Sequence, residues 1–198
     1  MAPKMSDIFS GPDGSTPLSP QDQKGLRQSW IVTRDDLNTA EQNNILAGRA
    51  WALRSRINLT SEAYLMRLHS RLFGDVWSWA GKFRTVETNI GVLPHELPIR
   101  LRQFLGDVDY WRANDSFLPD ELIARFHHGL VLIHPFTNGN GRHTRFAADL
   151  MCRQLGVEAF SWGRDSLDVT GTARRAYLSA LRDADGHDFG PLLAFARS

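Results

Sequence analysis

The sequence contains very little cysteine: Cys152 is the only one among 198 residues. A single thiol cannot form an intrachain disulfide, which excludes the class of small disulfide-stabilised secreted domains. A lone cysteine is commonly a small buried residue, and we expect Cys152 to be one rather than a catalytic thiol. The lack of disulfides fits a reducing compartment, so we expect a cytoplasmic protein.

Long hydrophobic runs and an excess of one charge are also missing. No apolar stretch approaches the roughly 20 residues that span a bilayer, and the N-terminus lacks the apolar segment of a signal peptide. We therefore expect no membrane partner. The chain has 23 Lys and Arg residues against 22 Asp and Glu, a formal net charge of +1. This balance offers no electrostatic reason for direct nucleic-acid binding.

Length and hydrophobic periodicity predict one mainly α-helical domain. Gly and Pro among polar residues at the start predict a partly irregular N-terminal tail or wrap over 1–30. The domain is expected over 31–198, with its core at about 40–185. Helical spacing of apolar residues is seen at about 37–56, 60–74, 99–113, 120–133, 142–155 and 171–183, and a short terminal helix is expected around Leu192, Leu193 and Phe195. We expect Thr33 and Thr60 to cap the first two of these helices.

The segment from Trp77 to Pro98 has a different pattern. Apolar and polar residues alternate loosely, and Pro94 and Pro98 interrupt any helix. This favours a small β-hairpin with Thr88 and Asn89 near its turn. A plain surface connection is the alternative that these residues leave open.

Residues 134–145 read His-Pro-Phe-Thr-Asn-Gly-Asn-Gly-Arg-His-Thr-Arg, and this run carries most of the functional information. The preceding helix should end at His134, because Pro135 lacks an N–H and restricts the residue before it. An imidazole has an ordinary pKa of about 6.5 and can accept a proton near neutral pH. We expect Phe136 to point into the core.

The second half of the run predicts an anion site. Gly139 and Gly141 permit positive φ and close approach of a ligand. Several N–H groups then converge at the start of a helix expected near Arg142, where the helix dipole favours negative charge. Arg142 and Arg145 lie three residues apart on one helix face and can donate to phosphate oxygens. The alternative is a glycine-rich helix start with solvated arginines.

The run resembles the signature of the Fic family, His-Pro-Phe-x-[Asp/Glu]-Gly-Asn-Gly-Arg-x-x-Arg, at every fixed place except Asn138. Residues 79–84, Trp-Ala-Gly-Lys-Phe-Arg, are similar to the segment that leads into the family's flap. The whole chain, including Trp162 and Gly163, resembles the bacterial subgroup called mobile mystery protein B. The resemblance implies a single-domain Fic-type helical bundle with a small β-hairpin flap beside the active-site loop.

The resemblance also implies a protein adenylyltransferase, which moves AMP from ATP to a Ser, Thr or Tyr hydroxyl of a target protein and releases pyrophosphate. His134 would deprotonate the hydroxyl, and the flap at about 86–92 would hold the target by strand addition. The residues that would bind the nucleotide phosphates are Gly139, Asn140, Gly141, Arg142 and Arg145.

Asn138 departs from the family pattern, in which an acidic residue binds the Mg²⁺ that bridges the phosphates. An amide oxygen lacks a full charge, so we expect weaker Mg²⁺ binding at Asn138. Two function classes therefore stay open. One is the nucleotidyltransferase, and the other is a catalytically weak nucleotide-binding or regulatory module, such as the toxin-like half of a two-component pair.

Many Fic relatives carry an autoinhibitory [Ser/Thr]-x-x-x-Glu-[Gly/Asn] pattern. In this chain no Glu has Ser or Thr four residues before it. We therefore expect any inhibition to come from a partner protein or another mechanism. The subgroup's companion, mobile mystery protein A, resembles a helix-turn-helix protein and is the first candidate partner. The target protein, the preferred nucleotide and the oligomeric state are not specified by the sequence.

Overall fold

The structure is a computed structural model that describes residues 8, 18–164, 167 and 171–198. These residues are mainly helical, so the expectation of a single mainly α domain is confirmed. The only β pairing among them is an isolated bridge between Leu26 and Trp77. The elements are α2 (Pro20–Gln23), α3 (Arg34–Arg54), α4 (Glu62–Phe73), the 3-10 helix η1 (Pro94–Glu96), α5 (Leu97–Ala113), α6 (Pro119–Ile133), α7 (Asn140–Leu155), α8 (Thr172–Asp185) and α9 (Gly190–Arg197).

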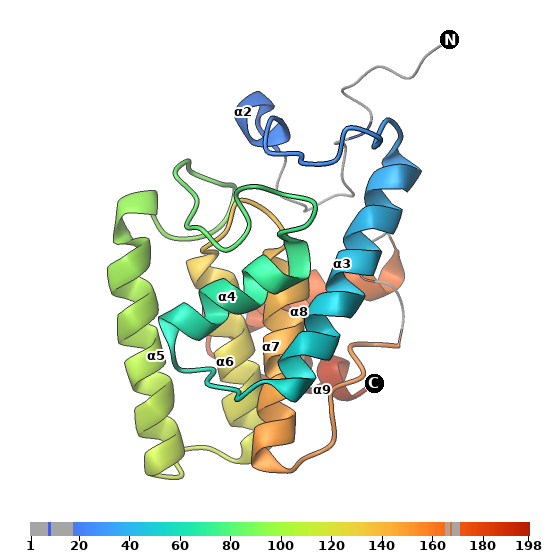
Figure 1. The fold of residues 1–198 in the computed structure, drawn as a ribbon. Helices are drawn as coiled ribbons and strands as arrows, with labels where there is room; N and C mark the ends of the chain where they lie inside the picture. Colours follow the sequence, from blue (N-terminus) through green and yellow to red (C-terminus); the bar gives the residue numbers. More distant parts are fainter. Residues whose placement is uncertain (1–7, 9–17, 165–166, 168–170) are drawn as a thin grey trace.

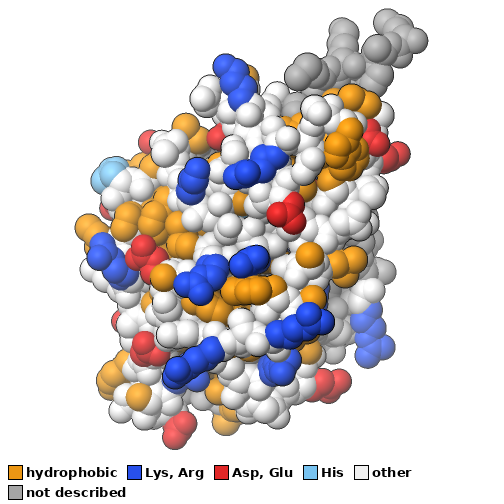
Figure 2. Space-filling model, in the orientation of Figure 1, with side chains coloured by type: hydrophobic (Ala, Val, Ile, Leu, Met, Phe, Trp, Pro, Cys, Tyr) orange, Lys and Arg blue, Asp and Glu red, His pale blue; other side chains and the backbone are white. Residues whose placement is uncertain are grey.

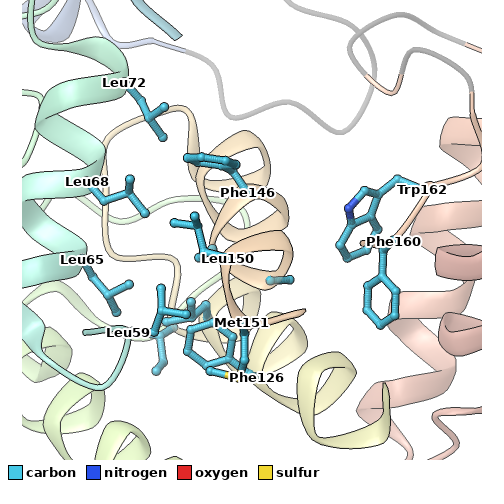
Figure 3. Packing of buried hydrophobic residues seen from close by; sticks show 14 of the residues in the cluster. Leu59, Leu65, Leu68, Leu72, Phe126, Phe146, Leu150, Met151, Phe160 and Trp162 are labelled. Carbon is cyan, nitrogen blue, oxygen red and sulfur yellow. The ribbon is translucent and has the colours of Figure 1, made fainter. Parts of the chain in front are cut away.

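Helices α6 and α7 form the centre of the bundle. They pack on each other, with α3 and α4 in front of α7 and α5 beside α6 (Figure 1). Helices α8 and α9 pack together and cover another side of α6. Figure 3 shows how the leucines of α4 and the apolar residues of α7 meet in the core. The labelled residues of this layer are Leu65, Leu68, Leu72, Phe146, Leu150 and Met151.

Local polar chemistry sets several helix ends. The Thr33 hydroxyl accepts from the Asp36 N–H, and the Asp36 carboxylate accepts from the Thr33 N–H, which makes the expected cap of α3 a full capping box. The cap of α4 is Ser61, whose hydroxyl accepts from the Tyr64 N–H. The prediction of Thr60 as this cap is wrong, because its hydroxyl donates to the side chain of Asn58.

The β-hairpin expected between α4 and α5 is not formed. Residues 82–93 contain no strand and run as an irregular loop into η1. The Arg84 N–H donates to the Pro135 carbonyl at 2.9 Å, and the Val92 N–H donates to the Ile133 carbonyl at 3.4 Å. A hairpin needs its two arms to bond to each other. Here both arms bond to the α6–α7 turn, which lies at the same end of the bundle (Figure 1).

The chain before α3 contacts the helical core where it is described. Ile8 is 5% exposed and belongs to the core. The Arg27 N–H donates to Val76, and the Ser78 N–H donates to Gly25, each at 2.8 Å. Residues 1–7 and 9–17 of the expected tail lie outside the described residues. The division into a wrap at 1–30 and a domain at 31–198 stays a prediction.

Cys152 lies in α7 and is fully buried. The pKa of its thiol is raised to about 11, mainly by burial, with a smaller contribution from the nearby Asp149 carboxylate. The group is therefore a neutral thiol at pH 7, and the expectation of a buried cysteine is confirmed.

The small net charge is not spread evenly over the surface. Figure 2 shows Lys and Arg side chains across the face with α3 and α4 in front, with most Asp and Glu toward its edge. This face is therefore more basic than the formal charge of +1 suggests. Within the described residues, no helix combines the length and the apolar character that crossing a membrane requires.

Candidate active site

His134 ends α6 in a left-handed backbone conformation, with φ 52° and ψ 60°. A residue other than glycine rarely adopts positive φ, so neighbouring segments must hold the backbone there. The His134 N–H still donates to the Leu130 carbonyl at 3.1 Å. The expected helix end at His134 is confirmed.

The His134 imidazole is 6% exposed. Its Nδ1 lies 3.4 Å from the Val131 carbonyl oxygen, which suits an Nδ1–H donor and puts the lone pair on Nε2. The pKa of His134 is lowered to about 4, mainly by burial and to a smaller extent by the Arg84 charge, while the Val131 contact acts to raise it. The ring is therefore neutral at pH 7, the state in which it can accept a proton.

Asn140 closes the loop that follows His134. Its Oδ1 accepts from the Phe136 N–H at 3.0 Å, and its Nδ2 donates to the Phe136 carbonyl at 2.7 Å. Phe136 is fully buried, as expected, and its ring stacks on His69 with centroids 3.7 Å apart. The Asn140 side chain therefore holds the loop. Because both of its polar atoms are engaged, Asn140 can contact an anion only through its backbone N–H.

Helix α7 begins at Asn140, two residues before the expected start at Arg142. Its N-cap, Gly139, has φ 77°, and a Cβ there would lie 2.8 Å from the Phe73 ring. Glycine is required at 139 for both reasons. No side chain caps this helix, so its first N–H groups point toward the turn as donors for an anion.

Arg142 is held by a carboxylate from another helix. Its Nη1 donates to Oε2 of Glu41 in α3 at 2.5 Å, and its guanidinium lies 4.8 Å from the centroid of the Phe73 ring. The other oxygen of Glu41 accepts from Nε1 of Trp77 at 2.7 Å. Sequence reasoning missed Glu41. A phosphate that binds Arg142 must share the guanidinium with this carboxylate or displace it.

We expect Glu41→Gln to lower the free energy of unfolding by about 1–3 kcal/mol, because the buried charge-assisted bond to Arg142 is lost. Urea denaturation measures the change. Glu62→Gln is the matched control, since Glu62 faces the exposed Arg102 at 3.7 Å, where such pairs contribute less than about 1 kcal/mol. Equal losses in the two variants would contradict the prediction.

Arg145 is positioned from the opposite side by α8. Its guanidinium lies 5.7 Å from the centroid of the Tyr177 ring, and the Tyr177 hydroxyl lies 2.8 Å from Nε2 of His127. Both motif arginines line a pocket of about 370 Å³ between α3 and α7. His134 is not among its lining residues, which are Gln42, Ile45, Leu46, Arg49, Leu72, Arg142, Arg145, Phe146, Asp149 and Trp162.

Asn138 does not offer a magnesium ligand in this arrangement. Its side-chain oxygen accepts from the Gly139 N–H at 2.7 Å and lies 3.5 Å from Nη2 of Arg142. Mg²⁺ prefers anionic oxygens in near-octahedral geometry. A neutral oxygen beside a guanidinium does not fit that preference. The described residues also contain no group of three or more His, Cys, Asp or Glu placed to hold a metal ion.

His69 is a second residue that sequence reasoning missed. Its Nδ1 accepts from the Gly81 N–H at 3.0 Å, so its Nε2–H donates to the Asn138 carbonyl, also at 3.0 Å. Burial lowers the pKa of His69 well below 6.5, and the nearby His143 adds to the lowering. The sequence places His69 on an apolar helix face, and only the tertiary contacts reveal that it connects two distant loops.

Comparison with known proteins identifies the family. Residues 59–152 match the sequence model of the Fic/DOC family. Protein adenylyltransferase fic-1 of Caenorhabditis elegans is 33% identical over 135 residues, which cover 66% of this chain and 25% of that protein. Protein adenylyltransferase VbhT of Bartonella schoenbuchensis is 29% identical over 108 residues, 51% of this chain and 22% of that protein. The chain thus spans about a quarter of the length of these curated relatives.

Solved structures share the fold. A fragment of Fic-1 from C. elegans superposes with a TM-score of 0.61 at 26% identity, covering 88% of this chain and 56% of that one. BepC from Bartonella tribocorum, solved with bound AMPPNP, gives a TM-score of 0.69 at 16% identity, covering 90% and 97%. The narrower resemblance to mobile mystery protein B stays a prediction. Because the sequence match and the helical fold agree, this chain contains a Fic/DOC family domain.

Proposed function

We propose that this chain is a nucleotidyltransferase that moves AMP from ATP to a Ser, Thr or Tyr hydroxyl of a target protein. The observation that carries the proposal is the buried neutral His134 at the end of α6, in the same short turn that leads to the glycine-rich start of α7. The proposal is also supported by Arg142 and Arg145, which line the same pocket. The relatives named protein adenylyltransferases and the BepC structure with bound AMPPNP support it as well.

In the proposed reaction, Nε2 of His134 takes the proton of the target hydroxyl while its oxygen attacks the α-phosphorus of ATP. A new oxygen–phosphorus bond forms as the bond to the bridging oxygen breaks, and pyrophosphate leaves with that electron pair. The N–H groups of Gly139–Gly141 would hold the phosphate oxygens, the Gly139 N–H after it releases the Asn138 side-chain oxygen. Arg142 and Arg145 would stabilise the charge on the leaving group, an electrostatic contribution that a buried site strengthens.

A second candidate is a nucleotide-binding or regulatory module with little transfer activity. Two observations favour it: Asn138 supplies no charge for a metal, and Glu41 already holds Arg142. Inhibition, if present, would then come from a partner protein, with mobile mystery protein A as the first candidate. ATP binding without transfer is the result that this candidate predicts.

Asn138→Asp separates the two candidates. We expect it to raise transfer of label from α-labelled ATP to protein by roughly tenfold to a hundredfold across a magnesium titration, the scale on which changes around metal sites act. The reason is that a carboxylate adds the anionic oxygen that Mg²⁺ prefers. Asn43→Asp adds the same charge at an exposed position of α3 and should leave transfer unchanged.

The outcomes of this experiment are distinct. The nucleotidyltransferase is supported if the natural protein transfers label and Asn138→Asp transfers more, while Asn43→Asp transfers the same amount as the natural protein. Thermal stabilisation by ATP with no label transferred by either protein supports the binding module. Neither stabilisation nor transfer would contradict both candidates.

A further inference from the structure

A buried arginine outside the predicted phosphate site holds the backbone at His134. Arg84 is 2% exposed. Its Nε donates to the His134 carbonyl at 2.7 Å, its Nη1 donates to the Val86 carbonyl at 2.9 Å, and its Nη2 donates to the Val92 carbonyl. One guanidinium therefore joins three carbonyls, one in the α6–α7 turn and two in the loop at residues 84–92.

The backbone strengthens this connection. The Arg84 N–H donates to the Pro135 carbonyl at 2.9 Å, and the Val92 N–H donates to the Ile133 carbonyl at 3.4 Å. The last carbonyls of a helix have no donor within the helix. At the end of α6 the 84–92 loop supplies donors to residues on both sides of His134. This explains what holds His134 in its left-handed conformation.

The 84–92 loop also touches the His134 side chain. Gly91 has φ 107°, and a Cβ there would lie 2.6 Å from Cβ of His134 and 2.7 Å from Nη2 of Arg84. The loop backbone thus lies directly against both side chains. Arg84 and the His134 side chain therefore share one loop neighbour at Gly91.

We propose that Arg84 is a positioning residue for His134: it fixes the left-handed turn and holds the 84–92 loop against the His134 side chain. The role of the His134 imidazole as a general base rests on the proposed function. Arg84 contacts the turn before Gly139, and its Nε, Nη1 and Nη2 donate to carbonyls of that turn and of the 84–92 loop. We therefore expect it to affect the proton-transfer step and to leave nucleotide binding unchanged.

Arg84→Lys tests the proposal, because lysine keeps the charge but cannot form the planar three-carbonyl contact. We expect kcat for label transfer to fall about tenfold to a hundredfold, the cost of misplacing a catalytic group by about 1 Å. The dissociation constant for ATP should stay unchanged. The pKa of His134, measured by NMR titration of the imidazole, should rise from about 4 toward 6.5 as water reaches the ring.

Arg197→Lys is the matched control. Arg197 also uses its guanidinium fork, bonding Asp120 and the Glu158 carbonyl, but it lies near the C-terminus and does not contact His134. The same substitution there should leave kcat and the pKa of His134 unchanged. An equal effect of both variants would mean that Arg84 acts only through general stability.

The NMR measurement separates this proposal from the proposed function. If the natural protein transfers no label but Arg84→Lys raises the pKa of His134, the positioning role stands and only the reaction is wrong. An unchanged pKa in a folded Arg84→Lys protein would overturn the positioning role.

If Arg84→Lys does not fold, Gly91→Ala tests the same contact from the loop. Gly106→Ala is its control, because a Cβ there meets nothing within 4 Å. A folded Gly91→Ala protein with an unchanged His134 pKa would also overturn the positioning role.

Discussion

Replacing His134 with alanine should abolish detectable transfer of label from ATP while ATP binding persists. A positioned general base contributes about 10²- to 10⁴-fold to a rate, and alanine removes the only proton acceptor in the proposed reaction. The amides of Gly139–Gly141 and the two motif arginines are untouched, so thermal stabilisation by ATP should remain. The measurement is label transfer together with the ATP-induced shift in melting temperature.

His143→Phe provides the control for this loss. His143 belongs to the same run, is fully buried, and its Nε2 lies 3.2 Å from the Leu65 carbonyl. Phenylalanine keeps an aromatic ring but cannot exchange a proton. We expect this variant to retain transfer at a pH where it is folded. Equal loss of transfer in His134→Ala and His143→Phe would show that the imidazole of His134 has no special role.

Acid should unfold this protein between about pH 6.5 and pH 4. Four buried histidines are neutral in the folded state because burial lowers their pKa values. The lowering is to about 4 for His134 and His143, to about 3 for His127, and well below 6.5 for His69. In the unfolded chain each imidazole has an ordinary pKa of about 6.5.

The sign of the effect follows from proton binding. Below pH 6.5 the unfolded chain binds protons that the folded chain cannot bind, so stability is fully present above about pH 6.5 and falls as the pH drops. Each histidine contributes a slope of about 1.4 kcal/mol per pH unit. Four together reach several kcal/mol near pH 5, comparable to the roughly 5–15 kcal/mol that stabilises a typical domain.

Urea unfolding followed by circular dichroism at a series of pH values measures this slope. His143→Phe should reduce it by about one proton, while His95→Asn, at an exposed position in η1, should leave it unchanged. Constant stability from pH 7 to pH 5 would contradict the prediction. Because His134 itself stays neutral down to about pH 4, acid should stop transfer by unfolding the protein before it protonates the base.

The features predicted correctly depend on residues close together in the chain. Thr33 caps α3 with Asp36 three residues on, and Gly156 ends α7 with φ 70°. The helix end at His134 follows from the proline beside it. The helix expected at about 120–133 is α6, whose apolar residues at helical spacing are buried: Leu122, Ile123, Phe126, Leu130 and Ile133.

The wrong predictions concern segments whose partners lie elsewhere. Residues 84–92 alternate as a strand would, yet their backbone groups bond to the α6–α7 turn because it offers unpaired carbonyls. The glycines at 139 and 141 predict a loop and a helix start near Arg142, but α7 begins at Asn140. The Asn140 side chain bonds the Phe136 backbone and lets the helix begin earlier.

The sequence by itself determined the helical class, most helix ends and the run at 134–145 that identifies the domain, because these depend on local spacing and on residue chemistry within about one or two turns. Only the tertiary structure decided what surrounds that run. Glu41 meets Arg142 across 101 residues, His69 meets Asn138 across 69, and Arg84 meets His134 across 50. Packing of helices brings these side chains together, and no rule about neighbouring residues contains that information.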